Sequence, residues 1–193
     1  MTAMNFIKIK QTRAKEITVL FELNEQGQKL LTDDVAPADY IQSLIENEDY
    51  PDAVSFFAYA LPKREATWWA CLCARSCQNE QSKFADRKAI ELAETWVYKP
   101  TSENCRPNFQ AAEATAFKSA AGWAAMAAFW SGDNISPIEG SIVPPADDLT
   151  PKAVVGAVML AAVQDGAEQV KAKYQLFLRQ GIDIASGGDG RKV

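Results

Sequence analysis

The spacing of apolar residues predicts helices along almost the whole chain. Apolar positions recur every three or four residues, and proline or capping residues separate the successive stretches. A weaker helical pair is expected between Thr12, as an N-cap, and residue 31, while residues 5–10 are too short a run to assign. The clearest stripes predict helices over about residues 37–48, 51–61, 62–77, 83–98, 102–117, 119–130, 151–163 and 167–185.

This pattern predicts an all-α fold, a single domain of about eight helices over residues 1–193. Residues 1–11 are expected to form an N-terminal arm, residues 131–150 a long loop, and residues 186–193 a tail that frays. Within the helix over 102–117, Pro107 should lie in the first turn or two. Ser82 is expected to cap the helix over 83–98, with Phe84 among its apolar contacts, and Thr150 followed by Pro151 to start the helix that ends at residue 163.

The stretch LPKREATWWACLCARSC, residues 61–77, is predicted to be the central helix. Pro62 suits a first turn, and Leu61 before it should separate this helix from the preceding one. A helix that is apolar on two sides is usually covered by neighbours on most of its surface. One side carries Trp68 and Leu72, and the other carries Ala66, Trp69, Ala70, Cys73 and Cys77.

A faint internal repeat relates the small-residue segments WACLCA, WAAMAA and GAVMLA. Stacked helical hairpins around the central tryptophan-bearing helix would produce such a repeat. Shared alanine-rich composition would produce it equally well, because the spacing between the copies is irregular.

Composition and charge exclude several classes of protein. The net charge of −5 disfavours a nucleic-acid-binding surface, and the basic cluster Lys8, Lys10, Arg13 and Lys15 is interpreted as a solvated face. The longest apolar runs, 120–130 and 153–163, are too short to span a bilayer, so no membrane insertion is expected. No secretory signal is visible, and the four cysteines suit buried thiols in a reducing compartment. These features predict a cytoplasmic protein.

The residues needed for ordinary catalysis are missing. The sequence has no histidine, which excludes the common hydrolase triads and histidine-containing zinc sites. A four-cysteine metal site is disfavoured because Cys71 and Cys73 would lie about 200° apart on a helix. No phosphate-binding loop motif occurs, and the glycines of residues 187–191 follow a helix where such a loop would precede one. We therefore expect no catalytic residue, metal or cofactor.

The polar start of the central helix has two interpretations. Lys63 and Arg64 lie in the first turn, where cations oppose the helix dipole and need a compensating partner. They could pair with Asp49 or Asp52, with Arg64 stacked on Trp68. Alternatively, the corner recognises an acidic group on a partner protein. The candidate partner-binding residues are Lys63, Arg64, Glu65, Trp68 and Arg75.

The loop over residues 131–150 also leaves two possibilities. Long loops are either functional or packed over the surface. Packing is favoured because several of its residues are too apolar to leave in water, and contact with a partner is the alternative. These residues are Ile135, Ile138, Ile142 and Val143.

Four segments together resemble an uncharacterised bacterial family, a domain of unknown function. They are LPKREATWWACLCAR, AAGWAAMAAFWSG, TPKAVVGAVMLAAV and FLRQGIDIASGGDGR, and the resemblance covers roughly residues 30–191. It implies placement beside type VI secretion genes, including those for spike and adaptor proteins, and no catalytic residues.

The resulting hypothesis is a non-enzymatic adaptor or chaperone-like accessory factor of a type VI secretion system. It would bind a secretion spike, adaptor or effector through the polar corner and the long loop. The alternative is a small-ligand-binding or enzymatic helical domain with a pocket between the tryptophan-bearing helices.

Overall fold

The computed structural model describes residues 5–138 and 140–193, and every regular element in these ranges is a helix. Residues 1–4 of the expected N-terminal arm and residue 139 of the expected loop lie outside the described residues. Eight of the described helices have eight residues or more, which confirms the prediction of an all-α domain of about eight helices. The helices are α1 (Lys15–Thr18), α2 (Glu25–Leu30), α3 (Pro37–Glu46), α4 (Tyr50–Ala60), α5 (Lys63–Arg75), α6 (Phe84–Tyr98), α7 (Ser102–Cys105), α8 (Pro107–Ala114), α9 (Ala120–Trp130), α10 (Leu149–Val163), the 3₁₀ turn η1 (Ala167–Gln169) and α11 (Val170–Ala185).

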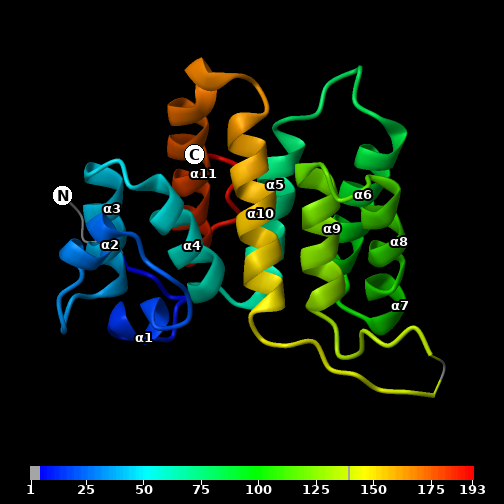
Figure 1. The fold of residues 1–193 in the computed structure, drawn as a ribbon, viewed down its shortest axis with the longest axis horizontal. Helices are drawn as coiled ribbons and strands as arrows, with labels where there is room; N and C mark the ends of the chain where they lie inside the picture. Colours follow the sequence, from blue (N-terminus) through cyan, green and yellow to red (C-terminus); the bar gives the residue numbers. More distant parts are fainter. Residues whose placement is uncertain (1–4, 139) are drawn as a thin grey trace.

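The long helices from α5 onward run up and down alternately, so that neighbours in sequence are antiparallel (Figure 1). Helix α9 packs against α5, α6, α8 and α10, and α10 also contacts α4, α5 and α11. Alanine fills most buried positions of α9, which lets these neighbours approach its backbone closely. The middle of the bundle is therefore shared by α5, α9 and α10. The small helices α1, α2 and α3 lie at one end (Figure 1).

Helix α5 lies inside the bundle, as its two apolar sides predict. Trp69 is fully buried, and its indole Nε1 donates a hydrogen bond to the Phe177 carbonyl of α11 at 2.8 Å. The Phe57 ring of α4 meets the Trp69 ring edge-on, with centroids 5.9 Å apart. Leu61 is extended between α4 and α5, which confirms the predicted break before Pro62.

The N-terminal segment differs from the predicted helical pair. Helix α1 is a single turn that begins at Lys15, so Thr12 is not its N-cap. Only the face with Ala14, Ile17 and Thr18 is buried, and the apolar residues that follow, Val19 and Leu20, are 71% and 53% exposed. One turn is enough to bury that face. Helix α2 does form after Asn24, whose side chain accepts hydrogen bonds from the first turn.

Three other local predictions were wrong. The helix expected over 102–117 is split into α7 and α8, because Pro107 begins a new helix at the junction. Lys83, without a side-chain capping bond, precedes α6 where Ser82 was expected to cap it. Phe84 is 76% exposed because, at 100° per residue, it faces away from the stripe of Ala89, Ala93 and Trp96 that contacts the bundle.

Candidate functional site

Three of the five predicted partner-binding residues lie together at one cleft. Arg64, Glu65 and Trp68, from the first turns of α5, line a hollow of about 360 Å³ that we call the Trp68 cleft. Its other walls come from the N-terminal segment, the end of α6, the end of α11 and the C-terminal tail. They are Lys8, Val97, Tyr98, Ile184, Gly187, Gly188, Asp189 and Arg191.

The C-terminal tail folds over Trp68. The indole Nε1 of Trp68 donates to the Asp189 carbonyl at 2.8 Å, and the Arg191 guanidinium lies 4.8 Å from the centre of the Trp68 ring. Arg191 Nη2 also donates to the hydroxyl of Tyr98 at 2.5 Å. The ring centroids of Tyr98 and Trp68 are 5.7 Å apart. Two aromatic rings and a guanidinium thus form one wall of the cleft.

Gly190 allows the turn that brings the tail against Trp68. It is buried with a φ of +70°, and a Cβ there would lie only 2.8 Å from Leu72 Cδ1, so glycine is required. Its N–H donates to the Asp183 carboxylate of α11 at 2.8 Å. The expectation of a frayed tail is therefore wrong for residues 189–191, which make these contacts, and stays a prediction for Lys192 and Val193. Asp189 and Gly190 are the sequence signal for this turn, but they do not reveal that it contacts Trp68.

The charged residues of the corner have other partners than predicted. Lys8 pairs with Glu65 at 3.0 Å, and Arg64 Nε donates to the Val97 carbonyl at 2.7 Å, near the end of α6. Lys63 lies 3.6 Å from Asp147. Arg75 forms two hydrogen bonds to Glu94, at 3.1 and 2.5 Å, away from the cleft.

The predicted pairing with Asp49 or Asp52 was wrong for a geometric reason. Both carboxylates lie at the start of α4, while the end of α4 leads into α5, so roughly 15 Å of helix separates them from Lys63. They instead accept hydrogen bonds from Asn24, at 2.7 Å for Asp49 and 3.0 Å for Asp52. Arg191, not Arg64, stacks on Trp68.

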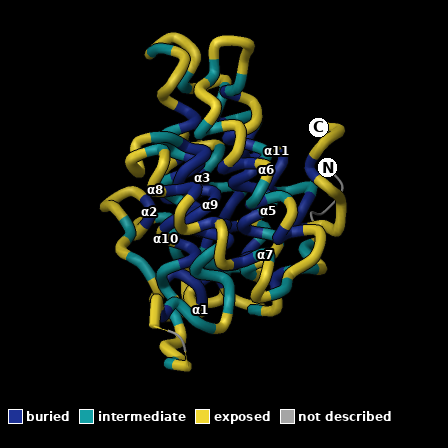
Figure 2. Tube along the Cα trace, turned by 90° about the vertical axis from the view of Figure 1, so that its right-hand side faces the viewer, coloured by how far each residue is buried: buried dark blue, intermediate teal, exposed yellow. Residues whose placement is uncertain are grey.

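The described residues between α9 and α10, 131–138 and 140–148, form a projecting arm, visible at the bottom of Figure 1 and largely exposed in Figure 2. The Ile135 N–H donates to the Val143 carbonyl at 2.8 Å. The Asn134 amide holds both sides together, because its oxygen accepts from Val143 N and its nitrogen donates to the Ser141 carbonyl. Ile138, Ile142 and Val143 are 67%, 79% and 45% exposed. The expectation that they pack against the protein was therefore wrong.

Hydroxyl groups join the two ends of the arm to α5. Ser131 Oγ shares hydrogen bonds with Thr150 at 3.2 Å and with Thr67 at 3.4 Å. Thr150 is therefore buried at this junction. The prediction that Thr150 and Pro151 start the helix is off by one residue, because α10 begins at Leu149. Next to the arm, a groove of about 530 Å³ is lined by Phe109 and Phe129, whose rings are 5.2 Å apart, together with Ile135 and Pro137.

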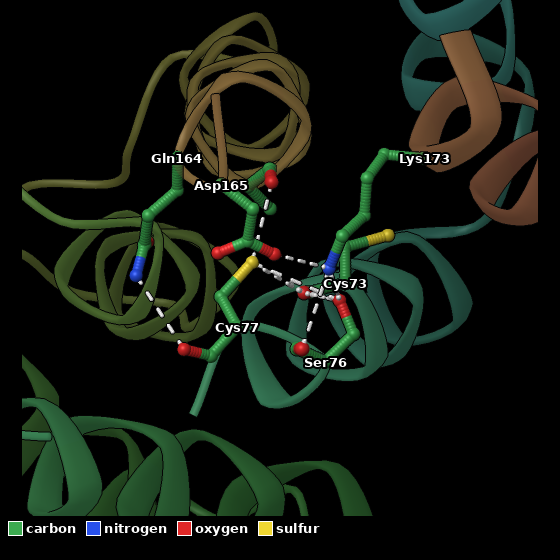
Figure 3. A network of polar contacts seen from close by, with 7 residues as sticks. Cys73, Ser76, Cys77, Gln164, Asp165 and Lys173 are labelled. Atoms are coloured by element: carbon green, nitrogen blue, oxygen red, sulfur yellow. Dashed lines mark hydrogen bonds and ion pairs between the residues drawn. The ribbon is translucent and has the colours of Figure 1, made fainter. Parts of the chain in front are cut away.

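The cysteines are poor nucleophiles. Burial raises the pKa of Cys71 and Cys73 far above that of a free thiol, and it raises the pKa of Cys77 as well. Figure 3 shows Cys77 directed at backbone oxygens, with Sγ 3.2 Å from the Ala161 carbonyl. Lys173, the nearby cation, is paired with Asp165 at 2.8 Å. Its charge is therefore neutralised by a carboxylate.

Over residues 5–138 and 140–193, no group of three or more cysteine, aspartate or glutamate side chains is arranged to hold a metal ion. In the same ranges, no helix combines the length and the apolarity that crossing a membrane would require.

The sequence model of one protein family matches residues 40–185 of the chain, and the family's description is that of a family of unknown function. The chain belongs to family DUF6931. The DUF6931 match runs from α3 to the end of α11 and includes the arm. Lys8 and Arg191, which complete the Trp68 cleft, lie outside the matched range. No curated protein and no solved structure is significantly similar to the chain.

Proposed function

We propose that this DUF6931 protein is a non-enzymatic accessory protein that binds another protein through its arm. The observation that carries the proposal is the exposure of Ile138 and Ile142 on a segment whose backbone is held in shape by internal hydrogen bonds. Exposed apolar side chains on a preformed element are typical of recognition surfaces, because binding then orders little additional chain.

The groove beside the arm supports the same proposal. Its aromatic rings give a partner an apolar hollow to fill, and Phe109 is itself 40% exposed. Buried aromatic and aliphatic anchors supply most of the affinity in protein interfaces. The buried, raised-pKa thiols and the absence of histidine from the sequence favour binding over catalysis.

The finer part of the proposal concerns the partner. The resemblance to a bacterial family encoded beside type VI secretion genes points to a cytoplasmic adaptor or chaperone-like role. The partner would be a spike, adaptor or effector protein of that apparatus. The family match supports the uncharacterised-family part of this resemblance.

Co-purification from the native bacterium tests the proposal. The tagged protein should recover a type VI secretion component, and Ile138→Asp together with Ile142→Asp should lose it without lowering the melting temperature, since both side chains are exposed. Val19→Asp is the matched control, because Val19 is 71% exposed outside the arm. Recovery of the component by the arm variant, or its absence from the wild-type sample, would refute the proposal.

The Trp68 cleft favours a second candidate function, small-ligand binding. It lies between α5 and the end of α6, two of the tryptophan-bearing helices, and its volume of about 360 Å³ falls in the range of small-ligand sites. A metabolite that raises the melting temperature, in a protein that captures no secretion component, would favour this candidate.

A further inference from the structure

Within residues 5–138 and 140–193, two guanidinium groups at the Trp68 cleft, those of Arg64 and Arg191, form no ion pair with a carboxylate. Among the described residues, Lys8 is the only cation of the cleft that forms an ion pair, and its partner is Glu65. Arg64 uses Nε for the Val97 carbonyl, and Arg191 uses Nη2 for the Tyr98 hydroxyl. Both guanidinium groups are thereby held at the cleft by one nitrogen each, and their remaining nitrogens can donate to a ligand.

The charges of the cleft therefore favour an anion. The charges of Lys8 and Glu65 cancel in their ion pair. The remaining charges of the cleft are the two positive charges of Arg64 and Arg191 and the negative charge of Asp189. The Asp189 carboxylate already accepts a hydrogen bond from the Arg191 backbone N–H at 3.1 Å. The cleft thus carries a net positive charge on a protein whose net charge is −5. Arg64 also lies in the first turn of α5, where the helix dipole adds to an anion's stabilisation.

The aromatic wall restricts what the anion is attached to. Trp68 and Tyr98 form an apolar surface beside the two guanidinium groups. The planar fork of a guanidinium matches the two oxygens of a carboxylate, and an aliphatic or planar stem can lie against the aromatic rings.

We propose that the Trp68 cleft binds a carboxylate-bearing ligand, with Arg64 and Arg191 on the carboxylate and the rest of the ligand against Trp68 and Tyr98. The carboxylate could belong to a small free acid or to an acidic side chain of a protein. The site uses α5, the end of α6 and the tail, so it stands whether or not the arm binds a partner.

The indole N–H signal of Trp68 in ¹H–¹⁵N NMR spectra reports on the site directly, because this group is hydrogen-bonded to Asp189. This signal is assigned by its absence from the spectrum of the Trp68→Phe variant. Glutarate is the free-acid probe, a capped pentapeptide with two glutamates is the peptide probe, and glutaramide is the neutral control. We expect a saturable shift in the millimolar range with at least one acid and none with glutaramide. A shift with glutarate indicates a small acid, and a shift with the peptide alone indicates a protein segment.

The double variant Arg64→Gln with Arg191→Gln should raise the Kd about tenfold, as the loss of two partly exposed charge contacts predicts. The matched control is Arg106→Gln with Arg179→Gln, which removes two exposed guanidinium groups that do not line the cleft. Arg191→Gln alone leaves the bond from Arg64 to Val97 in place, so it tests the site even if the double variant unfolds. Three results would each overturn the proposal. They are a shift with glutaramide equal to that with the acids, wild-type affinity in both Arg191→Gln and the double variant, and no shift with either acid.

Discussion

Replacing Trp69 with alanine tests the central position of α5. Trp69 is fully buried between α4 and α11. Truncation to alanine removes its edge contact with Phe57 and its hydrogen bond to the Phe177 carbonyl. Large-to-small changes of a buried tryptophan cost about 3–5 kcal/mol, because the cavity collapses only partly. For a domain of this size, that loss corresponds to a fall of roughly 6–20 °C in melting temperature.

Equilibrium unfolding in urea, followed by circular dichroism, measures the change in the free energy of unfolding. Trp68→Ala is the control on the same helix, because Trp68 is only half-buried and its loss should cost about 1–2 kcal/mol. The slope of free energy against urea should stay constant in both variants. If Trp69→Ala unfolds at the wild-type midpoint, the placement of this ring in the core is wrong.

Two further predictions concern Asp52 and Gly190. Burial raises the pKa of Asp52, so its charged form destabilises the fold, and that penalty appears as the pH rises from the unfolded pKa of about 3.9 through the folded value. Asp52→Asn should therefore raise the melting temperature at pH 7, and the gain should vanish below about pH 4; a gain of equal size at pH 3 would contradict this. Gly190→Ala should release the tail from Trp68, seen as faster hydrogen exchange over residues 186–193, and lower stability by about 1–3 kcal/mol. Gly140→Ala is its control, since Gly140 also has a positive φ but a Cβ there meets nothing within 4 Å; equal effects in the two variants would refute the steric argument.

The helical architecture could be predicted because apolar periodicity is a local property. The stripe around Trp69 identifies the buried face of α5. Ser119 marks the start of α9, and its side chain accepts a hydrogen bond from Gly122 N. Hydrophobicity alone gave a wrong prediction where the helical period places an apolar residue on the solvent side. The hydrophobicity of Phe84 predicts a contact with the bundle, but its angular position on α6 faces solvent.

The candidate site could be predicted only in part. Arg64, Glu65 and Trp68 share one turn of a helix, so their proximity follows from sequence spacing. Lys8 and Arg191 come from opposite ends of the chain, and no local pattern shows that they reach the same cleft. The outward direction of the arm's apolar side chains could not be predicted, because apolar composition does not show whether a loop's side chains turn inward or outward.

The hydroxyl junction of Thr67, Ser131 and Thr150 also bears on how this fold can diversify. The junction fixes the two points where the chain leaves α9 and enters α10. The packing of the helices therefore does not depend on the length of the arm between these points. Doubling such an excursion costs only about 0.6 kcal/mol in closure entropy. The same helical body can therefore carry longer, shorter or differently sequenced excursions, and specificity can change there while the scaffold stays as it is.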